Sequence, residues 1–541
     1  MRSGAGRRGV AWLVVAVLPA SFLAVFFAWP VAAIVGRGLD GGAVADVLGS
    51  PGLRQVAWFT LWQAAASTVL TLALALPGAY VLTRYDFPGR RVVRALVTVP
   101  FVLPSVVVGA AFVGLLGPRG PLGPLGLDQS VAAVLVAHAF FNYAVVVRTV
   151  GGLWAHLDPA LEDAARVLGA TRWRAFRLVT LPLLRPAIAA AAAIVFLFCF
   201  TSFGVVLVLG GPRRTTIEVE VYRQTAQLLD LRAAAALTLL QLAAVVALVA
   251  VHARAKRRRS GALRLRPSNE VRTRPQGRQR LVLAANLAVM AVLLGVPVAS
   301  LVERSFATEG GYGLASWRAL SDVRRGSTLF VSPLDALATS VTSALAATAI
   351  ALLVGGLAAF AVARHTSVAA RGFDALLMLP LGTSAVTVGF GFLITLDGPP
   401  LDLRRSALLV PIAQALVATP LVVRSLVPVL RSVDERLKEV AATLGAPPWR
   451  VLREIELPLV GRALLVGAGF AFAISLGEFG ATVFLARPDR PTLPVAIVRL
   501  LGQPGPLNLG QAMAMSTILL LVTVAAMFAI EGRRVGEVSE L

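Results

Sequence analysis

Long apolar stretches, each able to cross a bilayer, restrict the fold of this chain more than any other feature of its sequence. A helix needs about 20 apolar residues to span ~30 Å of hydrocarbon. Twelve stretches meet this requirement, six in each half of the chain. They lie at 10–35, 57–83, 93–116, 130–153, 186–210 and 233–252, and at 281–302, 335–363, 373–395, 406–428, 463–486 and 511–531. We therefore predict an all-α integral membrane protein of about 12 transmembrane helices.

The amino terminus has the pattern of either a signal peptide or a first membrane span. Three arginines, Arg2, Arg7 and Arg8, precede an apolar run that ends near Ala32 and Ala33, as in a cleaved signal peptide. The run 10–35 is longer than a signal-peptide core and long enough to cross the bilayer. We therefore expect an uncleaved first span.

The net charge of +23 is distributed between the apolar stretches rather than over a soluble face. That distribution argues against a nucleic-acid partner. It instead indicates which loops lie on the cytoplasmic side of the membrane. The connections that would be cytoplasmic contain Arg84, Arg90, Arg91, Arg94, Arg166, Arg172, Arg174, Arg177, Arg364, Arg371, Arg450, Arg453, Arg533 and Arg534. The alternate loops hold fewer basic residues, with Arg213, Arg214, Arg324 and Arg325 as exceptions. The positive-inside rule then places both termini in the cytoplasm of a bacterial cell.

A basic segment, 254–280, separates the two sets of six stretches. It carries eleven basic residues and one acidic residue, Glu270, with almost no apolar periodicity. Basic residues near anionic lipid each contribute ~1 kcal/mol of attraction. We predict a cytoplasmic linker on the membrane surface, and an inert solvated tether explains the composition equally well.

The chain contains an internal repeat. At a shift of 276 residues, eleven of the twenty-five positions in 158–182 are identical to those in 434–458. The same shift pairs Phe203 with Phe479 and Thr216 with Thr492. An even number of spans per copy leaves both copies with the same orientation, related by an axis along the membrane normal. We predict two parallel six-helix modules, 1–253 and 281–541, on either side of the linker.

The best-preserved part of the repeat is a loop rather than a span. The two loops, 158–186 and 434–462, follow the fourth stretch of each module. Lipid-facing sequence needs only apolarity, so retained Gly, Trp, Arg and Pro in an aqueous loop indicate docking onto a partner. Within them, 161–169 and 437–445 have the pattern of short amphipathic helices stopped by a glycine. A membrane-surface helix without a partner is the alternative.

These two loops resemble the EAA motif of binding-protein-dependent ABC importer permeases. That resemblance implies coupling helices seated on two copies of an ATPase subunit, and an extracytoplasmic substrate-binding protein. The motif positions fall on Glu162, Asp163, Ala164, Ala165 and Gly169, and on Glu439, Val440, Ala441 and Gly445. This sequence departs from the motif at Asp163 and Val440, where a glutamate and an alanine are usual, and Pro447-Pro448 stiffens only the second loop.

Sequence motifs for catalysis or metal binding are missing. A phosphate-binding P-loop requires a lysine after a glycine, and neither Lys256 nor Lys438 follows one. ATP and Mg²⁺ should therefore bind the partner ATPase, with no cofactor in this chain. We expect no catalytic residue and no metal site, because the four histidines (His138, His156, His252 and His365) lie far apart. The single cysteine, Cys199, is expected to be a buried apolar residue.

A second repeated block, 198–222 and 472–498, marks a candidate substrate pathway. Glu478 is an acid within an apolar stretch, where a charge costs ~2.5–3.5 kcal/mol, so it should face water or a partner group. A pathway role and a helix-packing hydrogen bond are equally plausible for it. Its repeat mate is Ser202. The candidate pathway residues are Thr201, Ser202, Phe203, Glu478 and Phe479.

This block and the fused architecture are similar to those of thiamine permeases, which implies thiamine or a thiamine phosphate as substrate. Fused ferric-iron permeases share the architecture, and molybdate and sulfate permeases have a similar G-E-F-G stretch. The alternative substrates are therefore ferric iron or an oxyanion.

A major-facilitator secondary transporter is the alternative from another class, because it also has twelve spans and a basic central loop. The segment 86–91 partly matches that family's D-[RK]-x-G-[RK]-[RK] motif, but Phe87 replaces the basic residue. That mechanism gives no reason for a duplicated loop after the fourth span.

Overall fold

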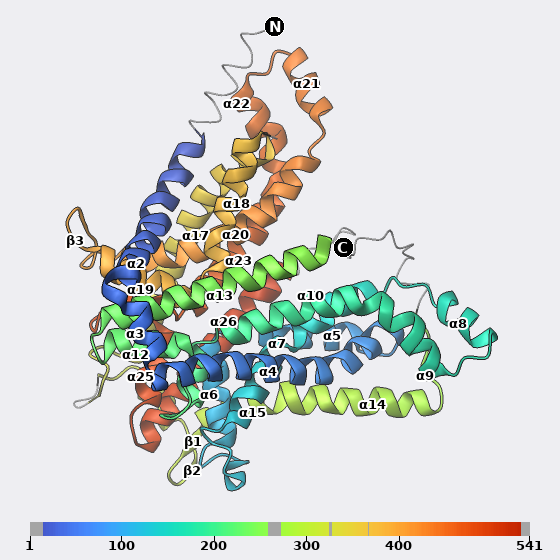
Figure 1. Ribbon diagram of the computed structural model, residues 1–541, viewed down its shortest axis with the longest axis horizontal. Helices are drawn as coiled ribbons and strands as arrows, with labels where there is room; N and C mark the ends of the chain where they lie inside the picture. Colours follow the sequence, from blue (N-terminus) through green and yellow to red (C-terminus); the bar gives the residue numbers. More distant parts are fainter. Residues whose placement is uncertain (1–14, 258–271, 324–326, 366, 532–541) are drawn as a thin grey trace. The chain divides into compact units, whose positions relative to one another are not determined.

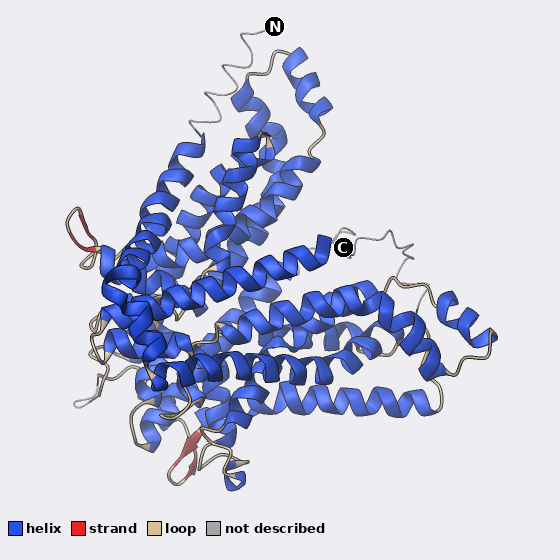
Figure 2. Ribbon diagram, in the orientation of Figure 1, coloured by secondary structure: helices blue, strands red, loops and turns tan. Residues whose placement is uncertain are grey.

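The computed structural model describes residues 15–257, 272–323, 327–365 and 367–531. These residues are helical almost throughout, with two short hairpins as the strands (Figure 2). The chain forms two compact units. Within the described residues, one unit consists of 15–44, 221–239 and 315–531, and the other of 45–220 and 240–314. The prediction of an all-α membrane protein is confirmed.

Figure 1 labels the α-helices of the first half except α11. The elements of the first half are η1 (Ala24–Ala28), α2 (Trp29–Leu39), η2 (Asp40–Gly42), α3 (Ala43–Gly49), α4 (Pro51–Arg84), α5 (Arg90–Val102), α6 (Ser105–Leu116), η3 (Gly123–Leu125), α7 (Val131–Trp154), α8 (Ala160–Val167), α9 (Arg172–Ala175), η4 (Phe176–Thr180), α10 (Leu181–Phe200), α11 (Gly204–Leu209), α12 (Ile217–Ala226) and α13 (Leu231–Arg257).

The second half contains helices and two pairs of short strands. They are α14 (Arg278–Met290), η6 (Ala291–Gly295), α15 (Val296–Ser305), β1 (Ala307–Thr308), β2 (Gly311–Tyr312), α16 (Ala315–Arg318), α17 (Pro333–Ala363), α18 (Val368–Gly382), α19 (Ala385–Thr395), β3 (Asp397–Gly398), β4 (Leu401–Asp402), α20 (Leu409–Ser432), α21 (Glu435–Thr443), α22 (Pro448–Val451), η7 (Leu452–Glu456), α23 (Leu457–Gly477), α24 (Thr482–Leu485), α25 (Leu493–Leu501) and α26 (Pro506–Glu531). The strands pair antiparallel as β1–β2 and β3–β4.

Ten helices of the described ranges are long and apolar enough to cross a membrane. Two bent pairs, α5 with α6 and α18 with α19, raise the number of spans to as many as twelve if each pair is one span. The pairs bend by 103° and 97°. In the first pair Pro104 follows the end of α5, and in the second Ser384 caps α19 through hydrogen bonds from the N–H groups of Val386 and Thr387. The third predicted stretch of each module is therefore broken rather than straight.

The fifth span of each module begins and ends earlier than the apolar pattern indicates. The predicted stretches were 186–210 and 463–486, whereas the continuous helices run over Arg172–Phe200 and Trp449–Gly477. Each helix breaks at the start of the second repeated block, and the apolar residues that follow form the short helices α11 and α24. The apolar pattern missed these breaks because hydropathy does not register a change in backbone direction.

In the unit that contains residues 45–220, helix α4 packs against α7, and α10 packs against both. Gly78 permits the close approach of α4 and α7, because a Cβ atom there would collide with the Tyr143 hydroxyl. Helix α15 packs on α6 and helix α14 on α4, so the first span of the second half belongs to this unit.

The other unit has an equivalent core. Helix α17 packs against α20, and α23 packs against both, with α26 alongside α23 and α25. Helix α2 packs on α19, where Gly391 leaves room for Pro30. The first span of each half thus packs in the compact unit formed mainly by the other half. The module boundaries at 253 and 281 were inferred from the repeat in the sequence, and they remain a prediction.

The centre of the predicted linker, 258–271, lies outside the described residues. At its end, Thr273 pairs with the connection that follows α4. The N–H of Thr273 donates to the carbonyl oxygen of Arg84 at 3.0 Å, and its own carbonyl accepts from Asp86 at 3.0 Å. This short contact ties the carboxyl end of the linker to the unit that contains α4.

Candidate functional site

The two predicted loop helices are present, as α8 and α21, and each ends at the expected glycine. Gly169 has a φ of +89° and Gly445 a φ of +78°, a left-handed conformation that a side chain disfavours. The hydrogen bonds match as well. Ala170 N–H donates to Ala165 and Ala446 N–H to Ala441, both at 3.0 Å. The repeat in the sequence is therefore a repeat in backbone conformation.

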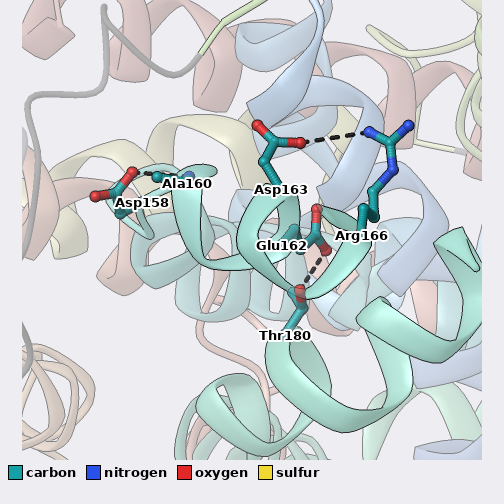
Figure 3. Close-up of polar contacts among 6 residues, drawn as sticks. All are labelled: Asp158, Ala160, Glu162, Asp163, Arg166 and Thr180. Atoms are coloured by element: carbon teal, nitrogen blue, oxygen red, sulfur yellow. Dashed lines mark hydrogen bonds and ion pairs between the residues drawn. The ribbon is translucent and has the colours of Figure 1, made fainter. Parts of the chain in front are cut away.

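Helix α8 is held by side chains that the close-up view shows (Figure 3). Asp158 accepts a hydrogen bond from the Ala160 N–H at 2.9 Å, and Arg166 pairs with Asp163 at 3.3 Å on the exposed face. Glu162 points the opposite way and accepts a hydrogen bond from the Thr180 hydroxyl. The two acids therefore have different surroundings, and Asp163 is the one that a partner could reach.

Large apolar side chains on the two loops are exposed in matched pairs. The exposed fractions are 88% for Leu168 and 82% for Leu444, and 69% for Trp173 and 62% for Trp449. A protein that folds without a partner usually buries large apolar side chains, and exposed ones are typical of a protein–protein interface. Because the same positions are exposed in both copies, we interpret the two loops as docking surfaces of one kind.

The motif positions have the same exposure in both loops. Asp163 and Ala164 are exposed, as are Glu439 and Val440. The next motif positions, Ala165 and Ala441, are both half-buried. Val440, which departs from the usual alanine, is 58% exposed and adds apolar area to the surface that a partner would meet.

Each loop leads into the fifth span through a π-helical segment. These segments, η4 and η7, cover Phe176–Thr180 and Leu452–Glu456, which are the same positions at the repeat shift. Single π turns inside helices are frequent at functional sites. Sequence reasoning did not find them, because no residue pattern in either segment predicts a π turn.

Of the candidate pathway residues in the first half, Ser202 lies in a buried polar network. Its hydroxyl lies 2.8 Å from Nε2 of His138, whose Nδ1 lies 2.9 Å from the Ser67 hydroxyl. The backbone carbonyl of Ser202 accepts from Thr216 at 3.0 Å. The neighbouring Phe203 is buried. The network joins α4, α7 and the break after α10, and it holds that break in a defined conformation.

In the second half, Glu478 occupies the matching break after α23. It is 6% exposed, and its carboxylate accepts hydrogen bonds from the N–H groups of Ala481 at 2.7 Å and Thr482 at 3.0 Å, and from the Thr482 hydroxyl. Glu478 is the residue at which α23 ends, and from there its carboxylate caps the N–H groups at the start of α24. Phe479 beside it is buried. The contacts match the helix-packing alternative, and the pathway role of Thr201, Ser202, Phe203, Glu478 and Phe479 stays a prediction.

Hydroxyl groups on the second span of each half fix the short helices beyond these breaks. Thr60 accepts from the Ile217 N–H at 2.9 Å, and Ser340 accepts from the Leu493 N–H at 2.6 Å. Each acceptor satisfies an N–H at the start of α12 or α25, which would otherwise be buried without a partner. The two halves thus use the same device at equivalent places.

The family model described as "Binding-protein-dependent transport system inner membrane component" matches residues 68–260 and 351–535. The chain belongs to this permease family. Its two matches correspond to the two halves of the repeat, so this permease carries the family domain twice. Family membership removes the major-facilitator alternative.

Relatives of the permease extend the comparison. The thiamine transport system permease protein ThiP of Brucella abortus (strain 2308) is 28% identical over 494 residues, 86% of this chain and 85% of that protein. ThiP of Escherichia coli (strain K12) is 29% identical over 468 residues, 83% of this chain and 84% of that protein. The sulfate transport system permease protein CysT of E. coli (strain K12) is 34% identical over 172 residues, 31% of this chain and 62% of that protein.

Proposed function

We propose that this permease is the membrane subunit of an ABC importer that moves a small solute into the bacterial cytoplasm. Two copies of an ATPase subunit dock on the cytoplasmic loops that contain α8 and α21, and an extracytoplasmic binding protein delivers the solute. ATP and Mg²⁺ bind the ATPase, since no P-loop occurs in this sequence. Both termini are cytoplasmic, and the chain carries no catalytic residue of its own.

The matched exposure of the two loops is the observation that supports this proposal most strongly. The exposed side chains are large and apolar, and they occupy equivalent positions of the repeat: Leu168 and Leu444, and Trp173 and Trp449. A helix that interacted only with the membrane surface would not need the same glycine stop and the same exposed face in both halves. Two equal docking surfaces on one chain fit a partner that is present in two copies.

The loops suggest how ATP hydrolysis could drive transport. After its glycine stop, each loop helix is followed by a short helix, α9 or α22. That short helix continues through a π-helical segment into a long helix that enters the membrane, α10 or α23. A partner that moves α8 and α21 on closing would move these two helices with them. Packed helices switch between discrete arrangements and do not deform continuously. A displacement at one end of such a helix is therefore transmitted to its other end. Alternating access then follows from the ATPase cycle.

The proposed solute is thiamine or a thiamine phosphate. The two relatives named as thiamine permeases align with more than four fifths of this chain. The sulfate permease aligns with only 31% of it, although at higher identity, and this supports an oxyanion as the second candidate. The case for ferric iron as the solute rests only on the fused architecture that this chain shares with ferric-iron permeases.

Cysteines introduced on the two loop helices test the docking proposal. Cys199 is fully buried, so Ala164→Cys and Val440→Cys would be the reactive thiols of the chain. Both positions are exposed, and we expect each to crosslink to the ATPase subunit in membranes that contain both proteins.

The matched control is Tyr312→Cys in the β1–β2 hairpin, which is 74% exposed and should not crosslink. Equal labelling of all three cysteines by a small maleimide in detergent confirms that they are accessible. Crosslinking of the hairpin, or of neither loop, would contradict the proposal.

A further inference from the structure

Each loop helix is fastened to the following span by a side-chain contact at one pair of positions. In the first half Glu162 of α8 contacts Thr180, the last residue of η4 (Figure 3). In the second half Lys438 of α21 contacts Glu456, the last residue of η7, with 3.4 Å between Nζ and Oε1. The repeat shift of 276 converts the first pair of positions into the second. The contact is retained although its chemistry is different.

The second contact is ionic and includes a third residue. Arg364, which follows α17, pairs with the same Oε1 of Glu456 through Nη2. The Glu456 side chain is 3% exposed, whereas those of Lys438 and Arg364 are 17% and 41% exposed. A carboxylate this buried requires compensating charge, and both cations come from elements other than its own helix. One buried acid therefore joins α21, the start of α23 and the end of α17.

The first half has different residues at two of the three positions. Glu162 and Thr180 form a single hydrogen bond with one charged partner. The arginine is retained, because a shift of 280 pairs Arg84 with Arg364. Helix α8 also packs directly on η4, whereas α21 packs principally on α22. The orientation of α21 therefore depends more on its side-chain contact than that of α8 does.

We propose that Lys438, Glu456 and Arg364 form an ionic clasp that fixes the orientation of α21 relative to α23. The three are positioning residues: they transmit movement of the docked helix to the membrane span. This inference rests on the proposed function, since it concerns the same loop. The second loop is thus connected to its span by ion pairs to Glu456, whereas the first loop is connected by a hydrogen bond from the neutral Thr180 hydroxyl.

Two variants separate the clasp from general stability. Glu456→Thr removes the ionic contact. Lys438→Glu combined with Glu456→Thr rebuilds the pair that is present in the first half, next to the arginine that both halves share. Glu454→Gln is the matched control, because Glu454 lies on the same π-helical segment but pairs with Arg450 on the exposed face.

The first measurement is a distance between nitroxide labels on the full chain in lipid nanodiscs, made without the ATPase because one label site, Val440, lies on the docking surface. Val440→Cys on α21 and Leu465→Cys on α23 supply exposed label sites. We expect one narrow distance distribution for the wild type and for Glu454→Gln. Glu456→Thr should broaden it, and the double variant should restore it. An unchanged distribution in Glu456→Thr, or a broad one in the double variant, overturns the clasp.

The second measurement is ATP-driven uptake of tritiated thiamine into proteoliposomes. Glu456→Thr should lower the uptake rate by about tenfold, within the range typical of coupling between sites, while the ATPase still copurifies. Uptake at the wild-type rate in Glu456→Thr overturns the proposal. Failure of the wild type to bind the ATPase would instead refute the proposed function, and the label distances would still decide the clasp. If Glu456→Thr does not fold, Lys438→Gln takes its place, because Arg364 still neutralises Glu456, and the same broadening is expected.

Discussion

A chain that carries Leu168→Glu and Leu444→Glu is expected to fold normally and to lose its ATPase subunits. Both leucines are more than four fifths exposed, so their replacement should change the free energy of unfolding by less than about 0.5 kcal/mol. In the docked complex each would be buried, and a buried carboxylate without a partner costs about 2 kcal/mol or more at a central interface position. Because each leucine would contact a different ATPase copy, the affinity of each copy should fall by about thirtyfold.

Copurification from detergent-solubilised membranes measures this loss, and the thermal unfolding temperature of the permease serves as the folding check. Leu168→Met with Leu444→Met is the matched control, because it keeps the apolar surface and should retain the complex. The docking surface would be misassigned if the glutamate variant bound its ATPase as tightly as the methionine variant.

The second large effect is expected at Glu478. Glu478→Ala removes the acceptor for two buried N–H groups and one hydroxyl, and hydrogen bonds to charged groups contribute about 1.5–3 kcal/mol each. We expect the free energy of unfolding to fall by roughly 3 kcal/mol or more. Glu478→Gln keeps one acceptor oxygen in place and should have a clearly smaller effect.

Thermal unfolding combined with uptake kinetics separates the two roles that the sequence left open for Glu478. The capping role predicts that stability falls in the order wild type, Gln, Ala, and that uptake follows the amount of folded protein. A pathway role predicts instead that Glu478→Gln folds like the wild type but has a raised KM for the solute. That second pattern would contradict the capping account.

The sequence was most informative where a residue type determines backbone conformation. Gly169 and Gly445 indicated where α8 and α21 end, and both glycines are in the left-handed conformation at those ends. The apolar stretches located the spans for the same reason, because every backbone polar group must be satisfied inside a membrane. Helices are the direct way for consecutive residues to achieve that.

The remaining features depend on contacts between distant residues. Hydropathy gives no information on neighbours, so it did not predict that α2 packs on α19 or that α15 packs on α6. The sharp bends between α5 and α6 and between α18 and α19 occur inside apolar runs that look continuous.

The polar contacts of the site were also hidden from the sequence. The repeat shift places Thr180 opposite Glu456, but that alignment does not show that Lys438 and Arg364 reach the same carboxylate. Likewise, His138 and Ser202 are far apart in the chain, and their hydrogen bond appears only when α7 and α10 are side by side. Identifying such pairs requires the fold.

The central claim is that ATP drives import through this permease. The most direct test is tritiated thiamine uptake into proteoliposomes that contain the permease, its ATPase and its binding protein, energised by ATP or by a proton gradient. The account predicts accumulation with ATP that requires both partners and is unaffected by a protonophore. Accumulation driven by the proton gradient in vesicles that contain the permease alone would contradict it.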